Sequence, residues 1–107
     1  MQTIAVQNRR IPRIGLGTYR LNDERCREVI QRGLELGYRH FDTAEAYGNE
    51  EAVGRALDES DVDRNELFVT TKVWWENLEG DEVRRHLEKS LQRLRMDRVD
   101  LTLIHWP

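Results

Sequence analysis

Residues 38–73 read YRHFDTAEAYGNEEAVGRALDESDVDRNELFVTTKV and carry a strand, a helix and a second strand in that order. The strands are predicted at Tyr38–Phe41 and Leu67–Val73, where the runs are short, apolar and β-rich. Between them, residues 49–59 place their apolar side chains on one helical face. Two strands joined by a helix of this length are typical of a right-handed βαβ unit, in which the strands run parallel.

The same alternation extends outward on both sides of this unit. A glycine-rich strand is predicted at Ile14–Thr18, followed by a helix over residues 22–37. On the other side, a helix at Asp81–Leu94 precedes a strand at Val99–Ile104. The segment Ile4–Ile11 has the pattern of a short hairpin with a polar turn. The sequence therefore predicts an α/β fold, with four parallel strands and three crossover helices after a hairpin.

Composition narrows the classes of function that fit. The 107 residues carry 17 basic and 20 acidic side chains, for a net charge of −3, which disfavours nucleic acid and anionic membrane as partners. No apolar run approaches the roughly 20 residues that a membrane span needs. The start lacks the layout of a signal peptide, and Cys26 is the lone cysteine. Together these features predict a protein of the reducing cytoplasm.

Four polar residues stand at or just beyond the ends of predicted strands. They are Asp42, Tyr47, Lys72 and His105. The carboxyl ends of parallel strands meet at one rim, where open α/β sheets and (β/α)8 barrels place their chemistry. An acid, a phenol, an amine and an imidazole on one rim are the parts of a proton-transfer site.

The chemistry of these groups follows from their expected neighbours. Lys72 ends an apolar strand and needs a partner, because an isolated buried charge is very costly; Asp42 is the nearest candidate by topology. A protonated ammonium beside the Tyr47 phenol favours its ionised form, which makes the phenol a better proton donor to a carbonyl oxygen. His105 could donate a hydrogen bond to the same oxygen. Each residue alone also fits an ordinary structural role, but their shared rim favours a functional one.

Aromatic residues follow the same strand ends. Tyr19 comes after the first strand, Trp74 and Trp75 after the third, and Trp106 after the fourth. Such side chains indicate an apolar pocket at the rim. Packing beneath loops explains Trp75 equally well.

Four ordered motifs resemble the aldo-keto reductases, over about Ile11 to Pro107. They are Gly15-Leu16-Gly17-Thr18-Tyr19, then Gly37-Tyr38-Arg39-His40-Phe41-Asp42-Thr43-Ala44 with Tyr47-Gly48-Asn49-Glu50, then Thr70-Thr71-Lys72-Val73-Trp74, and finally Val99-Asp100-Leu101-Thr102-Leu103-Ile104-His105-Trp106-Pro107. Within the family they are most similar to the bacterial diketogluconate and methylglyoxal reductase branch.

The resemblance implies NADPH-dependent reduction of aldehydes or ketones, with a small carbonyl compound as substrate. The implied catalytic roles are proton donor for Tyr47, tuning pair for Lys72 and Asp42, and substrate orientation for His105. The residues implied near the nicotinamide end of the cofactor are Gly17, Thr18, Tyr19 and Asp42. The residues implied to line the substrate pocket are Tyr19, Trp74 and Trp106. No metal is implied, since the hydride comes from the cofactor.

The resemblance also implies a (β/α)8 barrel whose base is closed by the hairpin. A complete barrel needs about 250 residues. Residues 1–107 are therefore expected to form one incomplete domain, the N-terminal half of the barrel, without the family's later phosphate-binding loops. Truncation, proteolysis or a natural half-barrel would each account for the length. Open sheet edges favour self-association of such a chain.

Two other classes of function remain open at this point. His40 and Asp42 alternate at a strand end, as metal ligands do in some (β/α)8 hydrolases, and His105 could be a further ligand. No further carboxylate or histidine follows at the other strand ends, which weakens this reading. The second possibility is a catalytically inert half-barrel that folds by self-association.

Overall fold

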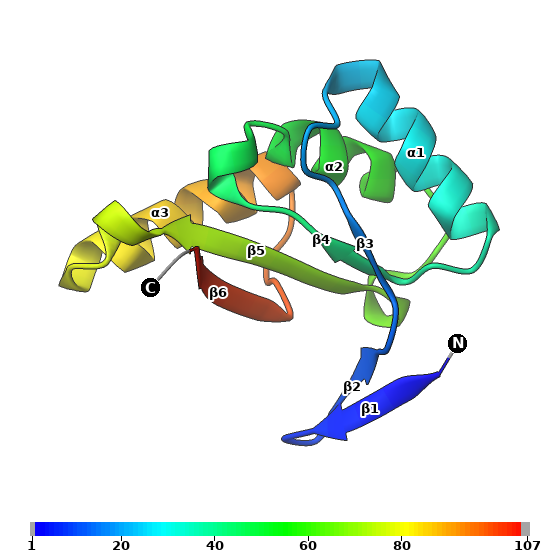
Figure 1. The fold of residues 1–107 in the computed structure, drawn as a ribbon, viewed down its shortest axis with the longest axis horizontal. Coiled ribbons are helices and arrows are strands. Elements are labelled where there is room, and N and C mark those ends of the chain that lie inside the picture. Colours follow the sequence, from blue (N-terminus) through cyan, green and yellow to red (C-terminus); the bar gives the residue numbers. More distant parts are fainter. Residues whose placement is uncertain (1, 106–107) are drawn as a thin grey trace.

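A sheet of four parallel strands and a separate hairpin make up the computed structural model, which describes residues 2–105 (Figure 1). The hairpin pairs β1 (Thr3–Val6) with β2 (Arg9–Pro12) in antiparallel register. The main sheet has the order β3-β4-β5-β6. Its strands are β3 (Gly15–Gly17), β4 (His40–Asp42), β5 (Phe68–Trp74) and β6 (Leu101–His105). The predicted order of parallel strands is confirmed.

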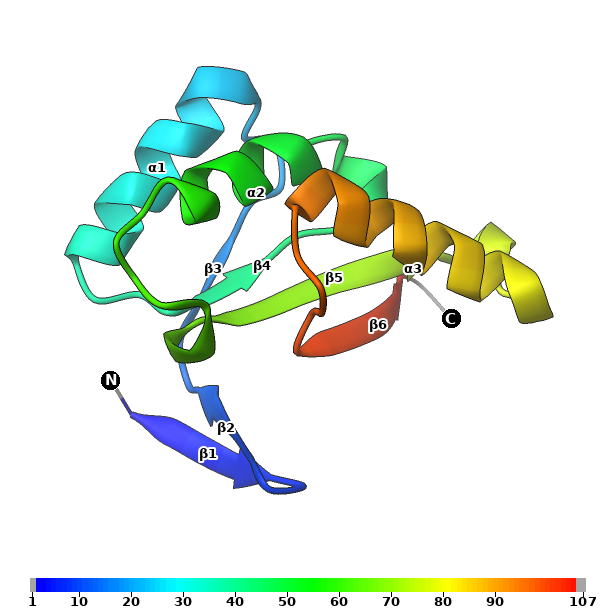
Figure 2. The same cartoon turned by 180° about the vertical axis from the view of Figure 1, so that it is seen from behind.

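Three helices cover one face of this sheet (Figures 1 and 2). They are α1 (Asp23–Glu35), α2 (Glu50–Asp58) and α3 (Gly80–Leu94). Each connects two neighbouring parallel strands, as a βαβ crossover does. No helix in residues 2–105 is long and apolar enough to cross a lipid bilayer.

Three short 3-10 helices complete the connections. They are η1 (Glu45–Tyr47), η2 (Arg64–Glu66) and η3 (Trp75–Asn77). The first follows β4 and the third follows β5, so both lie at the carboxyl rim of the sheet.

The hydrophobic core lies between the sheet and the helices. Apolar residues from the inner stripes of the helices meet those of β4 and β5 there, and all are buried: Cys26, Ile30, Leu34, Phe41, Val53, Ala56, Leu57, Leu67, Val69 and Leu94. Cys26 lies on the apolar stripe of α1, a position that favours packing in the core over a reactive thiol. The opposite face of the sheet carries the polar groups of the rim.

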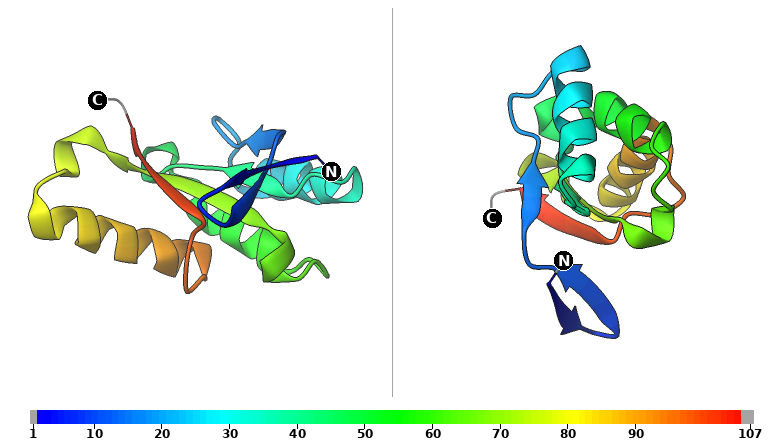
Figure 3. Two further views of the ribbon diagram at one scale, coloured as in Figure 1. Left: turned by 90° about the horizontal axis from the view of Figure 1, so that it is seen from below. Right: turned by 90° about the vertical axis from the view of Figure 1, so that its right-hand side faces the viewer.

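The hairpin stands apart from the four-stranded sheet, beyond the end at which β3 begins (Figure 3). Its turn at Gln7 and Asn8 uses positive φ angles of 47° and 65°. An ion pair between Arg9 and Asp100 connects it to the start of β6. The predicted hairpin is confirmed.

Candidate active site

Asp42 and Lys72 meet at the carboxyl rim because their strands are neighbours. Asp42 ends β4 and stands opposite Thr70 of β5. Lys72 lies two residues further along β5, on the same face as Thr70, because strand side chains alternate with period two. The Lys72 ammonium donates a hydrogen bond to Oδ1 of Asp42 and a longer one, of 3.4 Å, to the carbonyl of Thr43.

Tyr47 completes this contact from η1. The Lys72 Nζ donates to the Tyr47 hydroxyl oxygen at 3.0 Å and lies 4.9 Å from the centre of the phenol ring. Gly48 follows directly with a φ of 70°, a left-handed conformation that suits glycine, and so turns the chain away from η1 toward α2. The structure thus brings Asp42, Lys72 and Tyr47 together.

The electrostatic balance at Lys72 favours its charged form. Burial by itself lowers the pKa of Lys72, but hydrogen bonds to Asp42 and then to Tyr47 outweigh it, and the pKa is raised above its ordinary value of 10.5. Lys72 is therefore an ammonium across the neutral range. An ammonium within hydrogen-bond distance stabilises negative charge on the phenol oxygen when its proton leaves.

His105 approaches the same point from β6. It stands opposite Trp74 in the β5–β6 ladder. Its ring lies edge-on to Tyr47, with centres 5.6 Å apart, and edge-on to Trp74 at 5.3 Å. Within residues 2–105 its Nδ1 is buried and has no hydrogen-bond partner. The ring therefore has hydrogen-bonding capacity that this part of the protein does not use.

The glycine-rich strand borders the site on its other side. Gly17 pairs with Asp42, and a Cβ at Gly17 would meet no atom within 4 Å. The Thr18 side chain is buried, and both its backbone N–H and its hydroxyl donate to the Asp42 carbonyl at 3.0 Å. The Tyr19 side chain is 63% exposed, and its ring centre lies 5.2 Å from that of Tyr47. Tyr19 and Tyr47 therefore form one aromatic surface beside open space.

Two of the three residues implied to line the pocket lie beside the proposed catalytic groups: Tyr19 next to Tyr47, and Trp74 next to His105. The third, Trp106, lies outside the described residues. Trp75 packs its ring 6.0 Å from that of Trp74 and is exposed.

Asn49 holds the loop around the site in a way that sequence did not predict. Asparagine before a helix is expected to cap it. Asn49 does occupy the N-cap position of α2, but its side chain makes no capping bond. Its amide instead donates to the carbonyls of Thr18 and Leu21 at 2.7 and 2.8 Å, and its oxygen accepts from the Thr43 hydroxyl at 2.8 Å. Asn49 thus joins the loop after β3 to the loop after β4.

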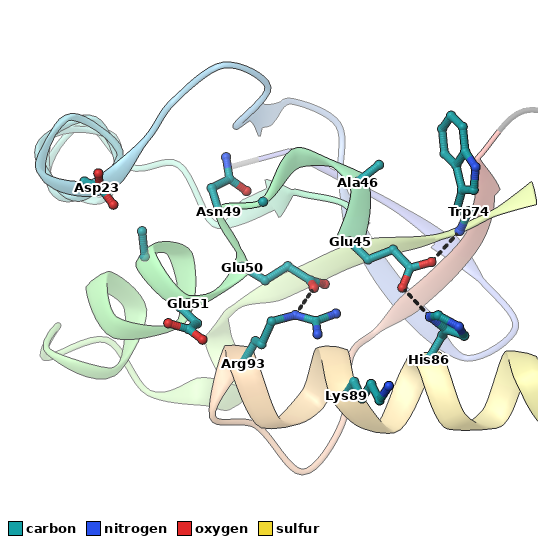
Figure 4. Close-up of a pocket in the computed structure, with 12 residues that line it drawn as sticks. Asp23, Glu45, Ala46, Asn49, Glu50, Glu51, Trp74, His86, Lys89 and Arg93 are labelled. Atoms are coloured by element: carbon teal, nitrogen blue, oxygen red, sulfur yellow. Dashed lines mark hydrogen bonds and ion pairs between the residues drawn. The ribbon is translucent and has the colours of Figure 1, made fainter. Parts of the chain in front are cut away.

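Two carboxylates near the site, those of Glu50 and Glu45, have partners that the sequence does not predict. From its place in the sequence, Glu50 is expected only to put a favourable charge at a helix start. In the structure it is 1% exposed and accepts hydrogen bonds from Thr71, Ser90 and Arg93. His86 lies beside the apolar stripe of α3, where a surface position is expected, but it is half-buried, and its Nδ1 lies 2.9 Å from Oε2 of Glu45 (Figure 4). These partners lie on separate elements, and no local pattern marks them.

The alternative of a metal site finds no support in this part of the chain. His40 is engaged by Thr70, with 2.9 Å between Nε2 and the hydroxyl, and packs edge-on against Phe68. Across residues 2–105 there is no group of three or more His, Cys, Asp or Glu side chains that could hold a metal ion.

Comparison with known proteins agrees with this geometry. A family model described as the aldo/keto reductase family matches residues 13–107. The chain belongs to the aldo-keto reductase family. The predicted resemblance is confirmed, and the four motifs that carried it all lie within or overlap the matched range.

Relatives within the aldo-keto reductase family show how similar this chain is to known members and how much of their length it covers. Methylglyoxal reductase DkgB of Salmonella typhi is 57% identical over 97 residues, which are 91% of this chain and 36% of the relative. Methylglyoxal reductase DkgA of Escherichia coli (strain K12) is 47% identical over 97 residues, again 91% of this chain and 34% of the relative. The chain thus spans about a third of the length of these curated relatives.

Solved aldo-keto reductase structures contain the same arrangement of elements. The aldo/keto reductase from Brucella melitensis superposes with a TM-score of 0.95 at 37% identity, covering 99% of this chain and 41% of that one. The predicted fold class, part of a (β/α)8 barrel with parallel strands, is confirmed.

Proposed function

We propose that this chain provides the catalytic side chains of a cytoplasmic enzyme that reduces aldehydes and ketones to alcohols with NADPH. The observation that carries the proposal is the Tyr47 hydroxyl, 3.0 Å from the Lys72 ammonium, which is itself paired with Asp42. A phenol held beside a buried ammonium is a proton donor with a stabilised conjugate base. Family membership supports the same reaction class.

Tyr47 acts as the general acid in this proposal. A carbonyl oxygen gains negative charge during reduction, and the Tyr47 hydroxyl gives it a proton. Lys72 stabilises the phenolate left behind, and Asp42 keeps Lys72 charged and oriented. His105 donates a hydrogen bond to the same carbonyl oxygen and so fixes the substrate in the reactive orientation.

The substrate is a small carbonyl compound of the methylglyoxal type. The curated relatives named above are methylglyoxal reductases. In this chain the proposed pocket walls are Tyr19, whose ring lies beside Tyr47, and Trp74, whose ring lies beside His105, with Trp106 as a third wall by family resemblance. Flat aromatic walls suit a small planar carbonyl group.

The residues at the rim fit the nicotinamide end of the cofactor. Space lies open beyond Gly17, where a side chain would otherwise project, and the partly exposed Asp42 borders it. Gly17, Thr18, Tyr19 and Asp42 would hold this end, Thr18 by fixing the Asp42 backbone. When bound, NADPH supplies the hydride.

The proposal is tested by Tyr47→Phe in a complete barrel. Residues 13–107 replace the matching segment of Salmonella typhi DkgB, and methylglyoxal-dependent oxidation of NADPH is measured. The variant is expected to lose roughly 10²- to 10⁴-fold in kcat, the usual contribution of a general acid, while NADPH binding by fluorescence titration stays unchanged. Tyr38→Phe, a tyrosine outside the site, is the control. Unchanged turnover in Tyr47→Phe removes the acid role.

For the 107-residue chain by itself we propose a single folding unit that self-associates. Leu103 and Ile104 of the edge strand β6 are 40% and 59% exposed, and they point to opposite faces of the sheet because strand side chains alternate. Apolar side chains on an unpaired strand edge favour contact with another chain.

Light scattering tests the self-association. The chain is expected to form dimers or larger species at moderate concentration, and Leu103→Lys with Ile104→Lys is expected to shift it toward monomer. A monomer in the unmodified chain contradicts the proposal.

A further inference from the structure

Glu45 occupies a junction of three elements beside the proposed active site. It is the first residue of η1, and its side chain is only 10% exposed. One carboxylate oxygen accepts a hydrogen bond from the backbone N–H of Trp74 at 2.7 Å, and the other lies 2.9 Å from Nδ1 of His86 on α3. Figure 4 shows the carboxylate between these two partners. Glu45 therefore links η1 to the end of β5 and to α3.

The Glu45 link spans the same two elements as the Tyr47–Lys72 contact. Tyr47 lies two residues after Glu45, at the other end of η1, and Lys72 lies two residues before Trp74 on β5. A displacement of η1 from the end of β5 would lengthen the 3.0 Å bond between Lys72 and Tyr47. Misplacement of a catalytic group by about 1 Å can cost about 10²-fold in rate.

Packing does little to hold η1 on the side that faces α3. Ala46 of η1 is exposed, and neither Glu45 nor Tyr47 is fully buried. A cavity of about 750 Å³ lies between η1, the start of α2 and α3, and Glu45, Trp74 and His86 are on its wall (Figure 4). Because the wall on this side is hollow, polar contacts rather than apolar packing position η1 there. A carboxylate that accepts from an N–H makes a hydrogen bond of the stronger, charge-assisted kind.

We propose that Glu45 is a positioning residue, which holds Tyr47 at hydrogen-bond distance from Lys72 by fixing η1 to the end of β5, with His86 as its outer support. The inference rests on the proposed function, since Tyr47 is the acid there. Glu45 acts through Tyr47 and is not itself catalytic.

The ionisation of Tyr47 is the decisive measurement, because it depends on the distance between the phenol and the Lys72 ammonium. Comparing two neutral replacements of Glu45 removes the effect of the carboxylate's own charge. The chain is produced with ¹³Cζ-labelled tyrosine, and the three tyrosine signals are followed by NMR as pH rises. Tyr47→Phe identifies the Tyr47 signal. Lys72→Met is the reference, because removing the ammonium moves the ionisation of Tyr47 to higher pH.

Glu45→Ala is expected to ionise Tyr47 at higher pH than Glu45→Gln does. Both variants lack the carboxylate charge, and they differ in whether η1 keeps its bond to the end of β5. The amide of Trp74 is expected to exchange faster in Glu45→Ala. Glu45→Gln keeps an acceptor oxygen for Trp74 and is expected to keep the exchange of that amide slow. Glu51→Ala, an exposed carboxylate on the same cavity wall, is the matched control.

Equal Tyr47 ionisation in folded Glu45→Ala and Glu45→Gln overturns the inference, as does a displacement to higher pH in Glu51→Ala. If Glu45→Ala does not fold, His86→Ala decides instead: displacement to higher pH supports the inference, and none overturns it. These measurements need neither substrate nor cofactor. Failure of the proposed function, seen as unchanged turnover in Tyr47→Phe, is therefore distinct from failure of Glu45 as a positioning residue.

Discussion

At the scale of single residues, Lys72 determines what the rim can do. An ammonium has three N–H donors, and Lys72 has three acceptors around it: a carboxylate oxygen, the carbonyl of Thr43 and the Tyr47 hydroxyl. This set stabilises the charge despite the burial that opposes it. A planar guanidinium cannot point single donors in these three directions, so arginine would not replace Lys72.

Cys26 gives a residue-scale prediction for pH. Burial raises the pKa of the Cys26 thiol from 9.0 to about 11, so the folded state keeps its proton more tightly than the unfolded state. The associated stability is fully present below pH 9.0 and is lost as pH rises toward about 11. At about 1.4 kcal/mol per unit, the loss is on the order of 2–3 kcal/mol. Cys26→Ala is expected to be less stable at neutral pH, because it leaves a small cavity, but to lack this alkaline loss.

Urea unfolding of both proteins over this pH range measures the effect. The difference in unfolding free energy between the original chain and Cys26→Ala should shrink between pH 9.0 and about 11. Taking the difference cancels the titration of other groups, such as Lys72. A constant difference across that range contradicts the prediction.

Sequence predicted the cluster at the candidate site better than its supports. That Asp42, Lys72 and Tyr47 lie together could be predicted because the ends of parallel strands converge, which makes position along the chain informative. Glu45 and His86 are 41 positions apart, and Glu50 and Arg93 are 43 apart. The pairing of these residues depends on how far apart the helices lie, and neither the local spacing of residues nor their type predicts that distance.

At the scale of elements, the approach of helices to their neighbours depends on two glycines. A Cβ at Gly54 in α2 would lie 2.6 Å from the Cα of Leu94, and it would also come too close to the carbonyl oxygen of Leu94. A Cβ at Gly33 in α1 would lie 2.7 Å from Cδ1 of Leu16, the far end of a flexible side chain. The obstacle at Gly54 is backbone at the end of α3, whereas the obstacle at Gly33 is a side chain that can rotate away.

Gly54→Ala and Gly33→Ala form a matched pair for this contrast. Alanine gains about 1 kcal/mol of helix propensity at either site. Overpacking against a fixed neighbour costs about 1–3 kcal/mol or more, so Gly54→Ala is expected to be destabilised overall. Gly33→Ala is expected to stay within about 1 kcal/mol of the original chain, because the Leu16 side chain can adopt another rotamer. Urea unfolding of the two variants measures both; equal effects would show that α2 and α3 can separate without cost.

The order of the elements was predictable, but some of their ends were not. The last strand was predicted from Val99 and begins at Leu101. The reason is Asp100, whose side chain accepts from the backbone N–H of Val69 while its own N–H donates to the Val69 carbonyl. A side chain thus replaces one rung of the ladder, and a pattern of apolar residues carries no sign of that exchange.

At the scale of the whole molecule, Asp100 joins the hairpin to the sheet. Its side chain is 1% exposed and pairs with Arg9 of β2 and Arg64 of η2 as well as with Val69. The three partners come from parts of the chain that make no common element. Arg9 belongs to the hairpin and contacts Asp100 from there, and its side chain is 48% exposed.

Two variants separate docking of the hairpin from stability of the sheet. Arg9→Ala is expected to cost no more than about 1 kcal/mol in urea unfolding, because the half-exposed Arg9 is screened by solvent and Asp100 keeps Arg64 and Val69 as partners. It is nevertheless expected to speed amide exchange in β1 and β2. Asp100→Asn is expected to cost roughly 2–3 kcal/mol, because hydrogen bonds to a buried charged group are lost, and to speed exchange in Leu101–His105 as well. If Arg9→Ala destabilised the whole chain as much as Asp100→Asn, the hairpin would be part of the cooperative core. Faster exchange confined to the hairpin would instead show that the four-stranded unit which positions Asp42, Tyr47 and Lys72 holds together without it.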